Sequence, residues 1–166
     1  MAEPASPEGQ LRHGRVLPFD RYDPLGGRKT YDLGLEMGGG NLGVGPGVKN
    51  YAFSRRPPKS PAAGVEFVRE PIRDFARGLR TSPGKDVWMM GGGGIIASFL
   101  DEGEIDEFVI HVIPTFIGEG IPLIAPRHRD VPLKLRALRR YPDGVVRLHY
   151  EVGSVPASPK RRRRAR

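Results

Sequence analysis

The sequence predicts an α/β domain with a largely parallel sheet flanked by helices and an antiparallel hairpin near the C-terminus. Three observations support this class. Apolar runs that suit buried strands alternate with segments of helical periodicity. Glycine-rich turns separate several of these runs. The last two apolar runs flank an Asp-Gly turn and alternate apolar with polar residues, which is typical of a half-exposed antiparallel pair.

Composition divides the 166 residues into three parts, and only the middle part is expected to fold as a domain. Residues 1–26 are rich in proline, glycine and charge, and we expect irregular structure there. Residues 27–152 contain the alternating apolar segments of the domain. Residues 153–166, "GSVPASPKRRRRAR", are expected to form a disordered basic tail.

The first half of the domain is predicted to contain two helices and two strands. We expect a short helix over 28–37 and strands over 48–53 and 65–68. The segment 70–79, "EPIRDFARGL", has an apolar stripe at helical spacing and a proline at a plausible first helical position.

The second half begins with a strand, a glycine turn and a helix. Residues 86–90, "DVWMM", are apolar on both faces, as expected for a strand covered on both sides of a parallel sheet. Ile95 and Phe99 belong to the apolar stripe of the next helix, and Gly103 is a natural stop signal. Residues 107–117 predict a long buried strand, with Pro114 indicating a bulge or an edge near its end.

A hairpin is predicted at the end of the domain, where residues 132–138 and 145–152 flank Asp143 and Gly144. In the second of these strands, apolar side chains share one face and polar side chains share the other.

The net charge of +8 is concentrated in the tail, because the last seven residues carry six positive charges. Removing these six from 27 Lys and Arg leaves 21, against 19 Asp and Glu. A uniformly basic nucleic-acid-binding face is therefore not supported. The tail itself could contact a polyanion or an anionic membrane, or could simply be solvated.

Residue counts also limit the chemistry. The chain has no cysteine, which excludes disulfides and thiolate nucleophiles, and its four histidines show no pair at ligand spacing. We therefore expect no metal site. No apolar run approaches the ~20 residues of a membrane-spanning helix, and the first residues show no apolar signal-peptide core, so a cytoplasmic protein is expected.

Gly91–Gly94 stand between the predicted strand at 86–90 and the following helix. A phosphate group can lie against such a turn, because a helix N-terminus offers free N–H groups and partial positive charge. The alternative is a tight structural turn. The segment is not a full dinucleotide fingerprint, since Ile96 or Ala97 stands where the third glycine is expected.

Two further segments suit anions. Ser54, Arg55 and Arg56 follow a predicted strand, and Arg can grip a phosphate monoester such as the 2′-phosphate of NADP. "GRKT" at 27–30 opens the first helix with two cations and a hydroxyl. The alternatives are an ordinary basic turn and a solvated basic first turn, of which the helix dipole disfavours the second. Together the three segments indicate a phosphorylated dinucleotide as ligand.

The motifs "GRKTYD", "YAFSR", "DVWMMGGGGIIASFLDEGEIDEF" and "IPTFIGEGIPLI" follow one another in the order seen in the dihydrofolate reductase-like superfamily. Over residues 27–152 the chain resembles the branch that contains the reductase domain of the bifunctional riboflavin-biosynthesis deaminase–reductase. The resemblance implies NADPH as hydride donor, a small heterocyclic or sugar-derived substrate, and a homodimer.

The resemblance also assigns residues to sites. It places the cofactor on three motifs: Gly27, Arg28, Lys29 and Thr30; Ser54 and Arg55; Gly91, Gly92, Gly93, Gly94 and Ile95. It places Gly118, Glu119 and Gly120 near the substrate. Glu119 is the candidate catalytic carboxylate, and the alternative for it is a solvent-exposed loop acid.

The sequence departs from this family before "GRKT". Family members begin with a buried central strand that leads into an acidic turn, whereas "RVLPF" at 15–19 is short and broken by Pro18. We therefore expect that a central strand and a catalytic carboxylate are missing. We also expect the chain as written to be poorly soluble or marginally folded, with little or no reductase activity, as from a truncated or misread start. The leading hypothesis is an NADPH-dependent reductase. The alternatives are a catalytically silent nucleotide-binding or dimeric module and, less supported, a basic-tailed nucleic-acid-binding protein.

Overall fold

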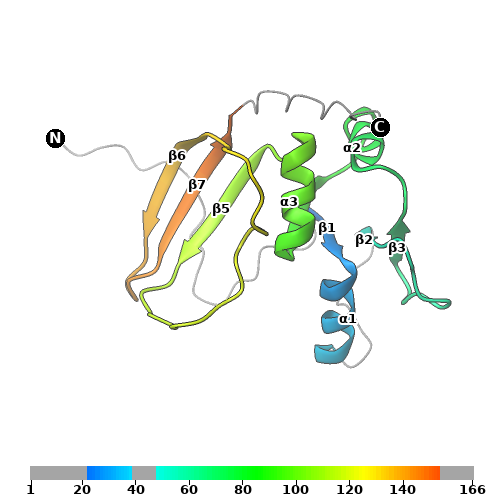
Figure 1. The fold of residues 1–166 in the computed structure, drawn as a ribbon, viewed down its shortest axis with the longest axis horizontal. Coiled ribbons are helices and arrows are strands. Elements are labelled where there is room, and N and C mark those ends of the chain that lie inside the picture. The colour runs from blue at the N-terminus through cyan, green and yellow to red at the C-terminus, as the bar shows by residue number, and fades with distance from the viewer. Residues whose placement is uncertain (1–21, 39–47, 154–166) are drawn as a thin grey trace, which may run out of the picture.

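The computed structural model of the chain describes residues 22–38 and 48–153, so most of the irregular N-terminal part and nearly all of the basic tail lie outside it. The described strands form a parallel sheet in the order β3-β2-β1-β4 and an antiparallel sheet in the order β5-β7-β6 (Figure 1). The elements are β1 Tyr22–Gly27, α1 Arg28–Met37, β2 Asn50–Phe53, β3 Val65–Val68, α2 Ile72–Thr81, β4 Asp86–Gly91, α3 Gly93–Glu102, β5 Glu107–Val112, β6 Leu133–Arg140 and β7 Val146–Val152.

Strand β1 lies inside the parallel sheet, between β2 and β4. Irregular structure was expected up to residue 26, and this is wrong from Tyr22 onward. Pro24 and the two glycines of β1 disfavour a strand in isolation. Pairing with a neighbour on each side overrides these local preferences, because most backbone groups of the segment find partners there.

The three helices confirm the predicted helical segments. Helix α2 begins at Ile72, with Pro71 as its N-cap rather than its first helical residue. Helix α3 ends at Gly103, which adopts a left-handed conformation with φ of 72°. Only glycine adopts this conformation without steric cost, so Gly103 stops the helix as expected.

The core of the domain lies on the face of the parallel sheet that α2 and α3 cover. Its buried residues are Leu25, Tyr51, Val68, Phe75 and Phe99. The Phe75 ring packs edge-on against Tyr51 with ring centroids 5.0 Å apart, a favourable geometry for aromatic pairs.

Helix α1 covers the opposite face of this sheet. Its Tyr31 packs edge-on against Phe67, at a centroid distance of 4.9 Å. Phe67 and Val68 are consecutive residues of β3, so their side chains point to opposite faces. The parallel sheet therefore has helices on both sides, as the predicted class requires.

The C-terminal hairpin is confirmed. Strands β6 and β7 pair antiparallel, and the turn between them is closed by hydrogen bonds between Tyr141 and Val145 and from the Gly144 N–H to the Tyr141 carbonyl. Strand β5 joins the hairpin on its other side, where Phe108 pairs with Tyr150.

Strand β5 is shorter and more exposed than predicted. It covers Glu107–Val112 instead of 107–117, and the side chains of Val109 and Val112 are 44% and 49% exposed. Pro114 has no N–H to donate, so it cannot continue a ladder of hydrogen bonds. The long buried strand expected here is therefore wrong.

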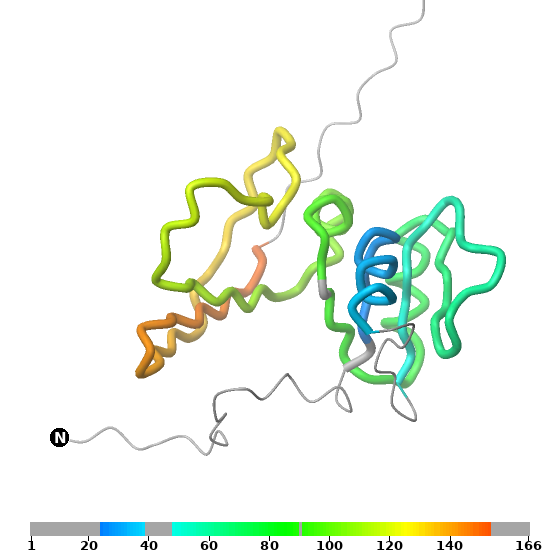
Figure 2. Tube along the Cα trace, turned by 90° about the horizontal axis from the view of Figure 1, so that it is seen from below, coloured from blue at the N-terminus to red at the C-terminus, as the bar shows by residue number. Residues whose placement is uncertain are grey.

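No described strand of the parallel sheet pairs with a described strand of the antiparallel sheet. Among the described residues, β4 pairs only with β1 and β5 pairs only with β7. Helix α3 connects these strands in the chain and stands between the two sheets in both views (Figures 1 and 2). The α/β class is confirmed, with its strands divided between two sheets.

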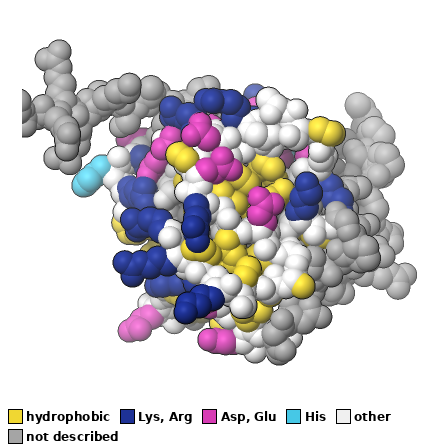
Figure 3. Space-filling view, turned by 90° about the vertical axis from the view of Figure 1, so that its right-hand side faces the viewer, with side chains coloured by type: hydrophobic (Ala, Val, Ile, Leu, Met, Phe, Trp, Pro, Cys, Tyr) yellow, Lys and Arg dark blue, Asp and Glu magenta, His cyan; other side chains and the backbone are white. Residues whose placement is uncertain are grey.

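The described part of the chain has no helix long and apolar enough to cross a membrane. The face formed by the right-hand side of Figure 1 carries Asp and Glu side chains among its Lys and Arg side chains, with hydrophobic side chains near the centre (Figure 3). This mixed face does not favour a uniform nucleic-acid-binding surface.

Candidate functional site

The carboxyl ends of β1, β2 and β4 lie next to one another. Gly27 at the end of β1 pairs with Phe53 at the end of β2, and Gly26 pairs with Gly91 at the end of β4. Each of the three predicted cofactor motifs contains or follows one of these strand ends. The structure therefore brings the three motifs together at the edge of the sheet where α/β proteins bind ligands.

Thr30 joins the first motif to the glycine turn. Its hydroxyl donates to the Gly91 carbonyl at 3.2 Å and lies 3.3 Å from the Gly92 N–H, which donates to it. The Gly27 backbone also packs close to Ile95, since a Cβ on Gly27 would lie 3.8 Å from the Ile95 side chain. These contacts fix the start of α1 against the start of α3.

Arg28 joins the first motif to the second. One guanidinium nitrogen donates to the Arg56 carbonyl at 2.9 Å, and Nε donates to Asp32 at 2.7 Å. The Arg56 N–H in turn donates to the Ser54 hydroxyl at 3.1 Å, which fixes the turn after β2. Arg28 thus orders the basic turn, a role that the sequence did not indicate.

Two predicted cofactor residues present free positive charge. Lys29 and Arg55 are exposed, and within residues 22–38 and 48–153 neither makes an ion pair with a carboxylate. Unpaired cations at the carboxyl end of a parallel sheet are well suited to bind a phosphate group.

Three glycines of the turn differ in their surroundings. Gly91 has φ of 120°, which favours glycine whatever the surroundings. A Cβ on Gly93 would lie 2.8 Å from the Pro122 carbonyl oxygen, so this glycine allows another segment of the protein to approach. A Cβ on Gly94 would meet no atom within 4 Å, so this position is open to a ligand.

The start of α3 is suited to an anion. Gly92 is its N-cap and offers no side-chain cap, and the first turn has no acidic residue. Uncapped N–H groups and the positive end of the helix dipole therefore remain for an external acceptor.

No described contact joins the predicted substrate residues to these motifs. Gly118, Glu119 and Gly120 are exposed in the loop after β5, and no described contact joins Glu119 to the glycine turn. The same loop does reach the turn a few residues later, where the Ala125 N–H donates to the Gly93 carbonyl at 3.0 Å.

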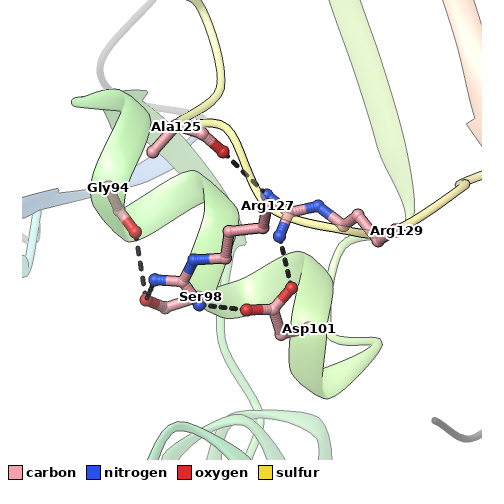
Figure 4. Close-up of polar contacts among 6 residues, drawn as sticks. All are labelled: Gly94, Ser98, Asp101, Ala125, Arg127 and Arg129. Atoms are coloured by element: carbon pink, nitrogen blue, oxygen red, sulfur yellow. Dashed lines mark hydrogen bonds and ion pairs between the residues drawn. The ribbon is translucent and has the colours of Figure 1, made fainter.

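The sequence analysis missed a polar cluster that holds this loop on α3. It consists of Ser98, Asp101, Arg127 and Arg129 (Figure 4). The signal that could have revealed it is weak: two polar residues three apart on a helix, and an Arg-His-Arg run in a distant loop.

A cavity of about 280 Å³ lies beneath the same loop, between α3 and β5. Its lining is mostly apolar and includes Leu100, Phe108 and Ile110, with Arg127 and Arg129 from the loop. It includes none of the predicted site residues, and no three His, Asp or Glu side chains gather as metal ligands in the described part of the chain.

Comparison with known proteins relates part of the chain to a known family. Residues 68–147 match the family model of the RibD C-terminal domain. Two proteins of Bacillus subtilis (strain 168), YwjB and YyaP, are 34% identical over 100 residues and 33% identical over 102 residues. These matches cover 60% and 61% of this chain but only 57% and 54% of the relatives' own lengths.

Solved structures show the same fold. A protein from Shewanella sp. PV-4 that is named for riboflavin biosynthesis superposes with a TM-score of 0.71 at 22% identity, covering 86% of this chain and 84% of that one. A pyrimidine reductase-like protein from Corynebacterium diphtheriae superposes with a TM-score of 0.57 at 15% identity, covering 82% and 77%. The chain therefore has the RibD reductase-like fold, and the match over residues 68–147 agrees with the resemblance indicated by its motifs.

Proposed function

We propose that this chain, with residues 68–147 matching the RibD C-terminal domain, is an NADPH-dependent reductase of the RibD-like family. The observation that carries the proposal is the meeting of three anion-compatible motifs at the carboxyl ends of β1, β2 and β4. When bound, NADPH would supply the hydride, and the protein would position it and the substrate.

The residues present fit this cofactor. Arg55 and Ser54, at the end of β2, would hold the 2′-phosphate. The start of α3 would hold the pyrophosphate, because Gly94 leaves open space and the first turn offers N–H groups. Lys29, which forms no ion pair with a carboxylate in the described part of the chain, adds a second positive charge beside the same strand ends.

The substrate would be a small heterocyclic or sugar-derived molecule that accepts hydride at a C=N or C=O bond. Glu119 is the proposed carboxylate at the substrate end, on the loop whose next residues, Pro122–Ala125, contact the glycine turn. Its proposed role is to supply a proton to the reduced bond.

A homodimer is proposed as the working form. The loop after β5 exposes large apolar side chains, with Phe116, Ile117 and Ile121 at 105%, 74% and 94% exposure. Monomeric proteins rarely leave such a group uncovered, so a second copy of the chain is a natural cover for it.

The test is a fluorescence titration of the purified protein with NADPH and with NADH. We expect tighter binding of NADPH, because only NADPH carries the phosphate that Arg55 would grip. Equal binding of the two cofactors, or no binding of either, would overturn the proposal.

A catalytically silent nucleotide-binding module is the second candidate. The exposed position of Glu119, without a described contact to the cofactor motifs, favours it. NADPH binding without NADPH oxidation, across a panel of pyrimidine and sugar-phosphate carbonyl compounds, would support this candidate over the reductase.

A further inference from the structure

The glycine turn needs support from outside itself. Four consecutive glycines carry no side chains that could pack and fix the backbone, and glycine has the largest conformational freedom of any residue. On one side the support comes from the Thr30 hydroxyl, which bonds to Gly91 and Gly92. On the other side it comes from helix α3 and the loop that follows β5.

The second support consists of two hydrogen-bonded arms that start at one carboxylate, Asp101 (Figure 4). In the first arm, Arg127 pairs with Asp101 and donates to the Ser98 hydroxyl at 3.2 Å, and this hydroxyl donates to the Gly94 carbonyl at 3.0 Å. The arm therefore ends on the glycine turn.

The second arm runs through the loop. Arg129 pairs with the other oxygen of Asp101 and donates to the Ala125 carbonyl at 3.2 Å. The N–H of the same Ala125 donates to the Gly93 carbonyl at 3.0 Å. Both arms thus end on consecutive carbonyl groups of the turn, Gly93 and Gly94.

The geometry points to Asp101 as a positioning residue for the glycine turn, and we propose that it pre-organises the turn for the cofactor pyrophosphate. Two guanidinium groups share its two oxygens, and the Arg129 side chain is only 13% exposed. Partly buried, charge-assisted bonds of this kind are stronger and more directional than an isolated surface ion pair. The cofactor part of the inference rests on the proposed function.

The decisive variant is Asp101→Asn, which keeps the shape of the side chain and removes its charge. We expect faster backbone amide exchange in the peptide covering Gly91–Ile95, measured by mass spectrometry without any cofactor. We also expect NADPH affinity to fall about threefold to tenfold, because a ligand that must order its own site binds more weakly.

The neighbouring carboxylate provides a matched control. Glu102 lies on the same helix and forms an ion pair of 2.9 Å with Arg73 of α2, away from the loop. Glu102→Gln likewise removes one negative charge and one ion pair. We expect it to change neither the amide exchange rate of Gly91–Ile95 nor the affinity for NADPH. Asp101→Glu should recover part of both properties.

Exchange and binding separate the two hypotheses. If the intact protein does not bind NADPH, the proposed function fails, but the exchange rates still decide whether Asp101 fixes the turn. An unchanged exchange rate at Gly91–Ile95 in Asp101→Asn would overturn the inference, as would a uniform increase across the chain that Glu102→Gln reproduces. If Asp101→Asn does not fold, Ser98→Ala cuts only the first arm and is judged by the same two measurements.

Discussion

The hydroxyl of Thr30 lies between the Gly91 carbonyl and the Gly92 N–H, and so links the helix that follows β1 to the turn that follows β4. Two motifs that are far apart in the sequence therefore share one side chain. Because both hydrogen bonds of this hydroxyl are made to the protein backbone, the role of Thr30 is to position the glycine turn.

Replacing Thr30 with Val should loosen this link. Valine keeps the branched shape but can neither donate to Gly91 nor accept from Gly92, and each lost hydrogen bond costs on the order of 1 kcal/mol. We expect a lower melting temperature by calorimetry and weaker NADPH binding. Thr30→Ser keeps the hydroxyl and serves as the control. A Val variant that binds NADPH as well as the Ser variant would contradict this prediction.

Replacing Arg55 with Ala should remove most of the preference for NADPH over NADH. A lost charge-assisted contact is worth about 1.5–3 kcal/mol, or roughly tenfold or more in affinity. The measurement is a pair of fluorescence titrations, one for each cofactor. Lys59→Ala, an exposed cation in the same connection between β2 and β3, is the control. If both variants keep the preference, the 2′-phosphate does not bind at Arg55.

Replacing Gly94 with Ala should weaken cofactor binding without destabilising the fold. Its Cβ would meet no protein atom within 4 Å, and alanine favours a helix over glycine by about 1 kcal/mol. A melting temperature that is unchanged or higher, together with weaker NADPH binding, would indicate that a ligand uses this space. Normal binding by Gly94→Ala would mean that the glycine serves only the turn.

Replacing Gly93 with Ala should instead destabilise the protein. The added Cβ would lie 2.8 Å from the Pro122 carbonyl oxygen, which real Cβ atoms do not tolerate, so the loop must move. We expect a lower melting temperature and faster proteolysis of the loop after β5. An unchanged melting temperature of Gly93→Ala would contradict this prediction, because the loop could then move away from the added Cβ at little cost in stability.

Local sequence patterns predicted the elements well where each element carries its own signals. The apolar stripe that includes Phe99 and the stop signal at Gly103 predicted α3. The Asp143-Gly144 turn predicted the hairpin. Strand β1 escaped prediction because Pro24 and its glycines disfavour a strand, and only pairing with β2 and β4 forms it. Such pairing depends on distant residues that no local pattern contains.

The sequence predicted the cofactor-motif residues of the candidate site but not the residues that hold the glycine turn in place. Motif residues such as Arg55 and Gly94 could be identified because their types suit phosphate. The Asp101 cluster could not, because its arginines lie in a loop far along the chain and meet α3 only in the fold. Glu119 remains a prediction, since the loop contacts the turn at Pro122 and Ala125 rather than at this residue.

The separation of β4 from β5 has a consequence for cooperative unfolding. No described ladder crosses between the sheets, so side chains of α3 provide much of their coupling: Phe99 packs in the core of the parallel sheet, and Leu100 lines the cavity with Phe108 of β5. Two such units can melt at different denaturant concentrations. Trp88, the chain's only tryptophan, lies in β4 and reports on one unit, whereas circular dichroism reports on both. We expect the fluorescence and dichroism curves in urea not to coincide, with the antiparallel unit opening first.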